Sequence, residues 1–216
     1  MAHKIDCGLG VNAFDLKACG DTFLYDHVMN LKVILAHGHF VALATVELEQ
    51  LLVRRGLAYN FALRNPRHTT YDAIPAWAKA TLEEHRRDQR ELTLTVEQLT
   101  DARSPDEVWN AAQLELRTRG VVHNYMRMLW GKLALTWMNE PREVFDALVH
   151  INDRFAMDGR DPNTYASIAW CFGVHDRPWP ERAIFGKVRC MTSRSARNKL
   201  DLDGYLAEAR SWRQEL

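Results

Sequence analysis

The chain has 216 residues, 47% of them hydrophobic, which is enough to bury one substantial core, so we expect a single compact domain. Lys plus Arg and Asp plus Glu are balanced at 28 each. A net charge of zero provides no global field to attract nucleic acid or an acidic membrane, so any contact with DNA would need a local basic patch.

Cysteine usage and apolar runs favour a cytoplasmic protein that stays reduced. The 4 cysteines show neither CxxC spacing nor the density of a disulfide scaffold, and the residues after Met1 do not resemble a secretory signal. The most apolar run, 33–46, is interrupted by His37 and His39 and is too short and too polar to span a bilayer. These two histidines also lack companion ligands at recognised spacing, so we expect no metal site.

Helix start and stop signals recur along the chain and predict an all-α domain over 21–216, preceded by a glycine-containing arm or lid at 1–20. Thr95 begins a capping box, and Ser104 begins another, with Pro105 at the first helical position and Gly120 as the stop. No alternating strand pattern competes. Helices are predicted at 21–36, 40–63, 75–87, from Thr95, 104–120, 121–138, 141–155, 161–173 and 203–213.

The helix predicted over 121–138 is apolar on almost every side. His123, Arg127 and Trp130 share one stripe on it, and a helix with so little polar surface lies at the centre of a domain. A guanidinium placed there needs a carboxylate or an anion. The nearest downstream carboxylates are Asp153, Asp158 and Asp161. The alternative is that Arg127 reaches the surface with its stem packed on apolar neighbours, and His123 is either a satisfied core histidine or a catalytic one.

Motifs spread from residue 46 to residue 205 resemble those of a known family. The matching segments are 51–55, 60–61, 77–79, 83–86, 109–113 (WNAAQ), 123–132 (HNYMRMLWGK), Trp137, 152–154, 158–163 (DGRDPN), 169–170, 175–177 and 185–189. In this order they resemble the C-terminal, FAD-binding helical domain of class II DNA photolyases. The resemblance implies an all-α helical bundle of the photolyase/cryptochrome FAD-binding type, lacking the N-terminal α/β antenna domain of that family.

The resemblance also implies roles for individual residues. Asn152 would face the flavin N5 atom, and Arg127 and Asp158 would pair beside the isoalloxazine ring. The implied electron relay runs through Trp130, Trp109 and Trp137, in that order. The side chains that would face a flipped DNA lesion are Tyr125, Met128, Trp170, Arg177 and Arg189. For each tryptophan the alternative is simple core packing.

Three departures from the family favour a protein without flavin. The antenna domain is absent, and the segment resembling Leu-Ser-Pro-Tyr-Leu-His-Phe-Gly, which helps to hold the flavin phosphates, is replaced by LAHGHF at 35–40. The position of a lesion-contacting glutamate is Gln50, and an amide cannot serve as a carboxylate acid or base. We therefore expect no cofactor, with FAD as the alternative.

The leading hypothesis is a repurposed protein that acts on an anionic small-molecule or carrier-protein-bound substrate by a non-redox acid/base step. Candidate catalytic residues are Asp158, Arg127, Asp161, Asn152 and Asp176. Candidate substrate-binding residues are Arg177, Arg189, Tyr125, Met128, Trp170, His123 and Gln50. The chain is also similar to short photolyase-like proteins of azinomycin-type biosynthesis, which implies intramolecular amine cyclisation to an aziridine with loss of an anionic leaving group.

Two other hypotheses stay open. The first is a flavin-dependent class II cyclobutane pyrimidine dimer photolyase, with FAD held by Arg127, Asn152, Asp158 and Trp130 and with DNA as the partner. The second is a non-catalytic partner subunit that keeps the fold as a binding surface. Under the leading hypothesis we also expect a protein partner that covers what the antenna domain would have shielded.

Overall fold

The computed structural model describes residues 49–213, and side-chain environments from Leu52 onward. The arm or lid predicted at 1–20, the helix predicted at 21–36 and the first part of the helix predicted at 40–63 lie outside these residues. The segment 35–40 and the histidines at 37 and 39 lie outside them too.

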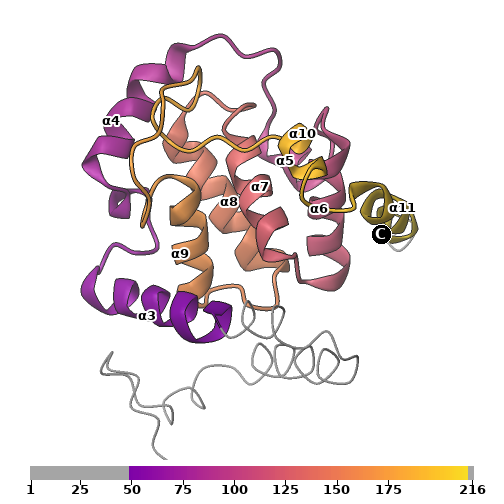
Figure 1. Cartoon of the computed structure of the whole chain (residues 1–216), viewed down its shortest axis with the longest axis horizontal. Helices are drawn as coiled ribbons and strands as arrows, with labels where there is room; N and C mark the ends of the chain where they lie inside the picture. Colours follow the sequence, from indigo (N-terminus) through magenta and orange to yellow (C-terminus); the bar gives the residue numbers. More distant parts are fainter. Residues whose placement is uncertain (1–48, 214–216) are drawn as a thin grey trace, which may run out of the picture.

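The described part of the chain is built from helices and loops (Figure 1), which confirms the all-α expectation. From residue 49 to residue 213 there is no strand, and an isolated backbone bridge joins Arg182 to Gly186. The elements are η2 (Glu49–Arg54), α3 (Arg55–Arg64), η3 (Tyr71–Ala73), α4 (Ala76–Glu84), η4 (His85–Arg87), α5 (Val96–Thr100), α6 (Glu107–Arg119), α7 (Asn124–Ala134), α8 (Pro141–Phe155), α9 (Pro162–Cys171), α10 (Ser193–Arg197) and α11 (Leu202–Trp212).

Helices α7 and α8 occupy the centre of the molecule (Figure 1). Helix α9 packs on both of them, α3 packs on α9, and α6 packs on α7 and α8 from the other side. Helix α11 covers the outer side of α6, so it is the most peripheral helix at that end. The same view places α4 at the opposite end from α11, beside the long loop that follows α9.

The start of α6 differs from the prediction. Its N-cap is Asp106, whose carboxylate accepts hydrogen bonds from the backbone N–H groups of Val108 and Trp109, both at 2.9 Å. Ser104, predicted as the cap, lies outside the helix and donates its hydroxyl to the carbonyl of Asp106 at 3.1 Å. Asp106 prevails because a carboxylate is both a strong cap and a favourable charge at a helix N-terminus. Gly120 ends α6 as predicted, at a φ of 73° in the left-handed region.

Helix α7 is shorter than predicted at both ends, and His123 explains its later start. His123 is exposed and is the N-cap of α7, with its Nδ1 atom accepting a hydrogen bond from the backbone N–H of Tyr125 at 3.3 Å. The buried stripe predicted to contain His123 therefore begins one turn later. The interpretation of His123 as a core histidine is wrong, because the residue is exposed, whereas its role toward a substrate stays a prediction.

The remaining helix signals were largely correct. Pro141 and Pro162 stand in the first turns of α8 and α9, and the carboxylate of Asp161 caps α9 by accepting from the backbone N–H of Asn163 at 2.7 Å. Thr95 forms the predicted capping box of α5 with Gln98. Helix α10 was not predicted, because its five residues are too few to show a periodic pattern.

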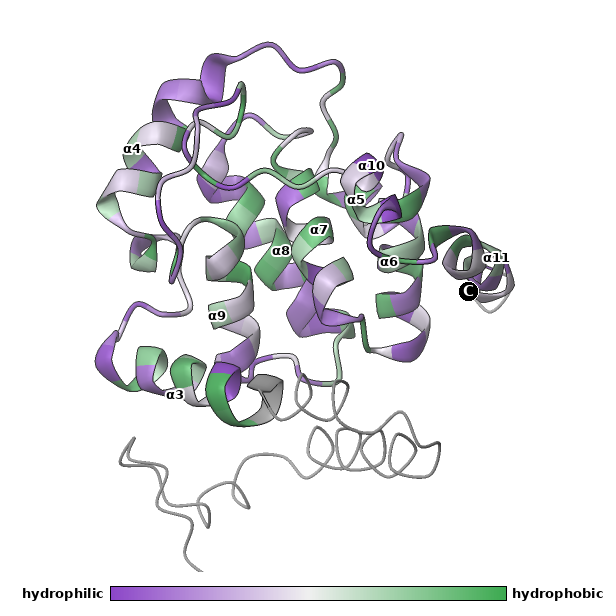
Figure 2. Cartoon of the chain, in the orientation of Figure 1, coloured by the Kyte–Doolittle hydropathy of each residue, from purple (hydrophilic) through white to green (hydrophobic). Residues whose placement is uncertain are grey.

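The hydrophobic core lies where α6, α7, α8 and α9 meet, and Figure 2 shows the apolar side of these helices turned toward the centre. Trp109, Phe145, Leu148 and Ile151 are completely buried there. Lys132 is also buried, and its ammonium group donates to the Cys171 carbonyl at the end of α9 at 3.0 Å. No helix among residues 49–213 is long and apolar enough to cross a membrane.

Candidate functional site

Arg127 pairs with a carboxylate, as predicted for a guanidinium on a helix with so little polar surface. From α7, its two terminal nitrogens donate to the two carboxylate oxygens of Asp158 at 2.9 and 3.0 Å. The side chain of Arg127 is 13% exposed and that of Asp158 is 5% exposed. A two-point guanidinium–carboxylate pair with so little water around it fixes both side chains in one orientation. The predicted pairing is confirmed, and the alternative of a surface-reaching Arg127 is wrong.

The turn between α8 and α9 places Asp158 for this pair. Gly159 follows it, at a point where a Cβ atom would lie 3.0 to 3.1 Å from the carbonyl oxygens of Ala156 and Asn152. Arg160 then adopts a φ of 68°, in the left-handed region, and its backbone N–H donates to Asp153 at 3.0 Å. A larger residue at position 159 would require the nearby backbone to shift, so Gly159 helps to fix the position of the Asp158 carboxylate.

Asn152 belongs to the same buried polar network. Its amide nitrogen donates to the Thr164 hydroxyl at 3.3 Å, and that hydroxyl donates to the Asp158 carbonyl at 2.8 Å. Asn152 is 1% exposed, and its side-chain oxygen is buried without a hydrogen-bond partner in the described structure. Buried polar atoms are almost always satisfied, so this oxygen marks a place for a donor from outside the described residues.

Three tryptophans form a continuous chain of rings beside this network. The rings of Trp109 and Trp130 are stacked, with centroids 6.2 Å apart and an interplanar angle of 13°. The Trp109 and Trp137 rings meet edge to face at 5.5 Å. The indole N–H of Trp130 donates to Gln113 at 2.9 Å, and that of Trp109 donates to the Trp130 carbonyl at 2.8 Å. The structure therefore places the three rings in contact in the order that the family resemblance implied.

The other carboxylates proposed as general bases are engaged elsewhere. Asp161 caps α9 and also accepts from the Tyr59 hydroxyl at 3.0 Å. Asp176 accepts from the Trp179 indole at 3.0 Å and from the backbone N–H of Arg177 at 2.9 Å. Each carboxylate is already hydrogen-bonded within the fold, so its use on a substrate would have to break those contacts.

A second polar region, which we call the basic pocket, lies between the start of α7 and the loop after α9. It has a volume of about 460 Å³ and is lined by Tyr125, Trp179, Pro180, Arg182, Arg189, Cys190, Met191, Thr192, Ser195 and Lys199. The Arg189 guanidinium lies 5.0 Å from the Trp179 ring, and the Lys199 ammonium lies 5.3 Å from the Tyr125 ring. None of the ion pairs within 49–213 uses Arg182, Arg189 or Lys199.

The residues expected to face a substrate are thus divided among several places. Tyr125 and Arg189 line the basic pocket, and Arg177 reaches it indirectly, with its guanidinium 5.5 Å from the Trp179 ring. Trp170 lies elsewhere, with the Arg54 guanidinium 4.6 Å from its ring and the His175 ring 5.4 Å away. Met128 contacts the Cys171 sulfur at 4.0 Å. Gln50 lies in η2, and its side chain is outside the described part.

Sequence reasoning missed several residues of these two regions. Thr164 and Gln113 hold Asn152 and Trp130, and Arg182, Lys199 and Trp179 line the basic pocket. Gln113 lies within WNAAQ, and Trp179 and Arg182 lie within RPWPER at 177–182, a segment rich in arginine and tryptophan, so these three could be found from sequence. Thr164 and Lys199 have no motif or periodic pattern that would single them out.

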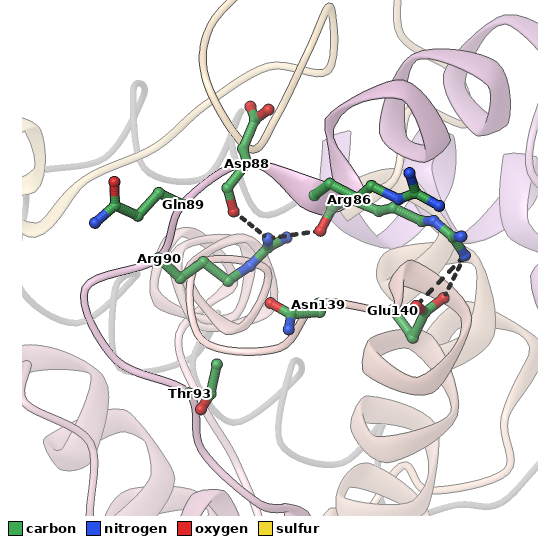
Figure 3. Close-up of a pocket in the computed structure, with 8 residues that line it drawn as sticks. Arg86, Asp88, Gln89, Arg90, Thr93, Asn139 and Glu140 are labelled. Carbon is green, nitrogen blue, oxygen red and sulfur yellow. Dashed lines mark hydrogen bonds and ion pairs between the residues drawn. The ribbon is translucent and has the colours of Figure 1, made fainter.

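Another pocket, of about 430 Å³, lies beside η4 and contains none of the predicted site residues (Figure 3). Arg90 crosses it and donates to the carbonyls of Arg86 and Asp88 at 2.9 and 3.0 Å, while Arg86 reaches Glu140 at 3.3 Å. Desolvation lowers the pKa of Arg90. Because these cations are already held by carbonyl and carboxylate groups, the pocket is a structural junction. Within the described residues no group of three metal-ligating side chains occurs.

Comparisons with known proteins identify relatives but no matching family model. The chain is 44% identical over 168 residues to a protein of Methanothermobacter thermautotrophicus named deoxyribodipyrimidine photo-lyase, covering 78% of this chain and 38% of that protein. Proteins of the same name from Oryza sativa and Arabidopsis thaliana are 41% identical over 161 residues and 38% identical over 165 residues. These matches cover 74% and 76% of this chain, and 32% and 33% of the two proteins.

The chain therefore spans about a third of the length of the curated relatives that it matches. The matches support the relationship to photolyases that the motifs indicated. They give no support to the aziridine-forming cyclase, and the DNA photolyase hypothesis is the better supported of the two.

Proposed function

Since the chain is related to deoxyribodipyrimidine photolyases through its helical core, we propose that it forms the flavin-binding helical region of a protein that repairs pyrimidine dimers in DNA with light. The observation that carries this proposal is the side-chain oxygen of Asn152, which is buried without a partner beside the Arg127–Asp158 pair. That oxygen can accept a hydrogen bond from a ligand.

The residues around Asn152 fit a flavin. A reduced isoalloxazine carries an N–H group at N5, and the Asn152 oxygen is an acceptor of the right kind for it. Thr164 holds the Asn152 amide nitrogen, so the side chain presents its oxygen without having to reorient. The Arg127–Asp158 pair provides a rigid polar wall that is already satisfied, so a neutral ring can lie against it without leaving a charge unpaired. When bound, the flavin would supply the electron that splits the dimer.

The tryptophan chain fits the supply of electrons to such a group. Trp130, Trp109 and Trp137 are in ring contact, and all three are at least 93% buried, with Trp137 the most exposed at 7%. Gln113 and the Trp130 carbonyl hold two of the indoles by their N–H groups. Core packing alone would explain the burial, and the ordered ring contacts are what favour a relay.

The basic pocket fits the DNA backbone. The protein has no net charge, so a local group of cations is what would attract a phosphodiester chain. Arg182, Arg189 and Lys199 provide it, and Trp179 and Tyr125 add aromatic faces on which a base could stack. Backbone contacts of this kind would fix the register of the strand while an unpaired base leaves the stack.

The flavin-free cyclase needs a free carboxylate base, and the structure offers poor candidates for one. Asp158 is bonded to Arg127 through both oxygens, and Asp161 and Asp176 are held by backbone and side-chain donors. The hypothesis stays a prediction, as does that of a non-catalytic subunit. The absorbance spectrum of the purified protein separates both from the proposal.

The experiment is to purify the protein, record its spectrum, and measure its thermal unfolding with and without added FAD. We expect flavin absorbance, or, if the cofactor is lost in purification, an increase in stability of about 2.7 kcal/mol at a flavin concentration 100 times the dissociation constant. A colourless protein whose melting temperature does not change with FAD would contradict the proposal and return the flavin-free hypotheses to first place.

A further inference from the structure

The cations of the basic pocket depend on a loop that has little regular structure of its own. This segment, residues 177–190, which we call the basic loop, carries Trp179, Arg182 and Arg189. A backbone bridge between Arg182 and Gly186 folds it into a tight turn. Whatever fixes the turn therefore fixes the positions of the cations on it.

Two backbone contacts fasten this turn to α4 and η4. The backbone N–H of Lys187 donates to the Thr81 hydroxyl at 3.0 Å, and that of Ile184 donates to the Asp88 carboxylate at 2.7 Å. Gly186, at a φ of 51°, sits so close to α4 that a Cβ atom there would meet Thr81 and His85. The basic loop is thus seated directly against the segment that contains His85.

His85 bridges the two sides of this seat. Its Nδ1 atom lies 2.6 Å from the Asp88 carboxylate, and its Nε2 atom lies 3.1 Å from the carboxylate of Glu181 on the basic loop. A neutral imidazole has one N–H group and can donate to only one of these acceptors. The doubly protonated imidazolium can donate to both, so the bridge to the loop is complete only when His85 is charged.

We propose that His85 is a positioning residue: when protonated, it joins Asp88 to Glu181 and holds the basic loop in the shape that presents Arg182 and Arg189 to a polyanion. When His85 loses a proton, one ring nitrogen becomes an acceptor that faces a carboxylate oxygen, and that hydrogen bond is lost. The bond to Glu181 is lost first, because the Glu181 side chain is exposed. That the polyanion is DNA rests on the proposed function, whereas the seating of the loop does not.

The surroundings of His85 raise its pKa and so favour the protonated form that bridges the two carboxylates. The hydrogen bond to Asp88 raises the pKa of His85, burial opposes it, and the bond to Glu181 raises it further. Around Asp88, the backbone N–H of Ile184 and then His85 lower the pKa of the carboxyl, with Arg90 acting in the same direction. Since the pKa of His85 is raised on folding, its stabilisation is fully present below the ordinary histidine value of about 6.5 and is lost as the pH rises through the folded value.

The pocket itself offers little else that titrates in this range. Guanidinium groups stay charged, and a phosphodiester does not titrate. Burial raises the pKa of the Cys190 thiol away from neutrality. A fall in polyanion binding as the pH rises past the ordinary histidine value of about 6.5 would therefore come from the seating of the loop.

The first test measures the seat without any ligand. Histidine signals are followed by NMR from below to above this pH, together with the hydrogen exchange of the Ile184 and Lys187 amides in wild type and in His85→Gln. We expect the protection of both amides, measured against their intrinsic exchange at each pH, to fall as His85 loses its proton, and to be low at every pH in His85→Gln. The matched control is His150→Gln, which changes an exposed histidine of α8. Exchange that is unaffected by the His85 proton would overturn the proposal.

The second test measures binding of a single-stranded thymidine oligonucleotide by fluorescence anisotropy at the same pH values. Wild type and His150→Gln should lose about fivefold or more in affinity as the pH rises, the lower end of common coupling between sites. His85→Gln should bind weakly with a flat profile, and Glu181→Gln should move the transition to lower pH because one carboxylate that holds the proton is gone. Equal profiles in wild type and His85→Gln would overturn the proposal. Absence of binding at every pH, with normal amide protection at low pH, would instead contradict the DNA-binding part of the proposed function.

Discussion

The interior network and the basic pocket handle charge in opposite ways. In the interior network, Arg127 and Asp158 neutralise each other through two short hydrogen bonds, and the neighbouring Asn152 oxygen is among the buried atoms of the described structure that have no hydrogen-bond partner. In the basic pocket, Arg182, Arg189 and Lys199 have no ion-pair partner in the same part of the chain, although each remains in contact with water. Burial explains the contrast, because an unpaired charge is tolerated only where water can solvate it.

Under the proposed function, the difference matches what each region would bind. The interior offers a single acceptor in a rigid, charge-balanced setting, which suits a neutral or weakly polar ring. The basic pocket offers several cations and two aromatic faces, which suit a phosphate-bearing chain. Variants that affect one region and spare the other can test this division.

The largest expected effect follows from replacing Trp109, the central ring of the tryptophan chain. Trp109→Phe should abolish light-driven reduction of bound flavin, because the ring that contacts both Trp130 and Trp137 is replaced by one that is far harder to oxidise. Absorbance during illumination with a thiol reductant measures it. Trp212→Phe is the control, since Trp212 is equally buried but packs between α6 and α11. If both variants behave alike, the chain of rings is core packing and no more.

The next largest effect concerns the charge balance of the interior. Asp158→Ala should lower the free energy of unfolding by about 3 kcal/mol, near the low end for a broken buried pair because Arg127 keeps slight contact with water. Urea denaturation measures it. Asp72→Ala removes the partner of Arg142 in an exposed pair and should change stability little. Similar losses in the two variants would mean that Arg127 finds water as easily as Arg142 does.

A smaller effect is expected at the start of α6, the helix that carries Trp109. Asp106→Ala should cost about 1 to 2 kcal/mol, because it removes an N-cap with two backbone hydrogen bonds and a contact to Ser193 at 2.6 Å. Thermal unfolding measures it. Ser104→Ala, the residue that the sequence pattern favoured as the cap, should cost less. The reverse order would restore the sequence-based assignment.

The smallest effect belongs to the basic pocket. Arg189→Ala should weaken DNA binding modestly and reduce the slope of log affinity against log salt by about 1, as expected for the loss of one phosphate contact. Its stability should hardly change, since no carboxylate of the described chain depends on Arg189. Arg142→Ala, at a cation that is already paired, is the control and should leave the slope intact. An unchanged slope for Arg189→Ala would remove the pocket from the DNA interface.

Much of the interior could be predicted from sequence because its constraints are local or strongly patterned. The apolar stripes of α7 leave Arg127 either a carboxylate partner or a route to the surface, and Asp158 is among the three nearest downstream carboxylates. Trp109 lies on α6, whose end Gly120 signals, Trp130 lies on α7, and Trp137 follows α7. The family motifs then gave the order of the rings, which periodicity alone could not.

The basic loop could not be predicted for the opposite reason. Its turn is held by Thr81, His85 and Asp88, which lie nearly a hundred residues earlier in the chain, and such tertiary contacts leave no periodic trace. The capping role of His123 was missed for a related reason, because a residue one position before a helix can share its spacing and still point outward. Local patterns specify helices, whereas loops are specified by what they touch.

The most direct test of the account is the affinity for FAD of wild type, Asn152→Leu and Asn139→Leu, measured by quenching of flavin fluorescence. Asn152→Leu keeps the volume of the side chain but removes the unpartnered oxygen, and Asn139→Leu makes the same change at an exposed position. We expect wild type and Asn139→Leu to bind flavin equally, and Asn152→Leu to bind about tenfold more weakly or worse, as for a lost buried hydrogen bond. Equal affinity in all three proteins, or no affinity in any of them, would contradict the claim that the interior network is a flavin site.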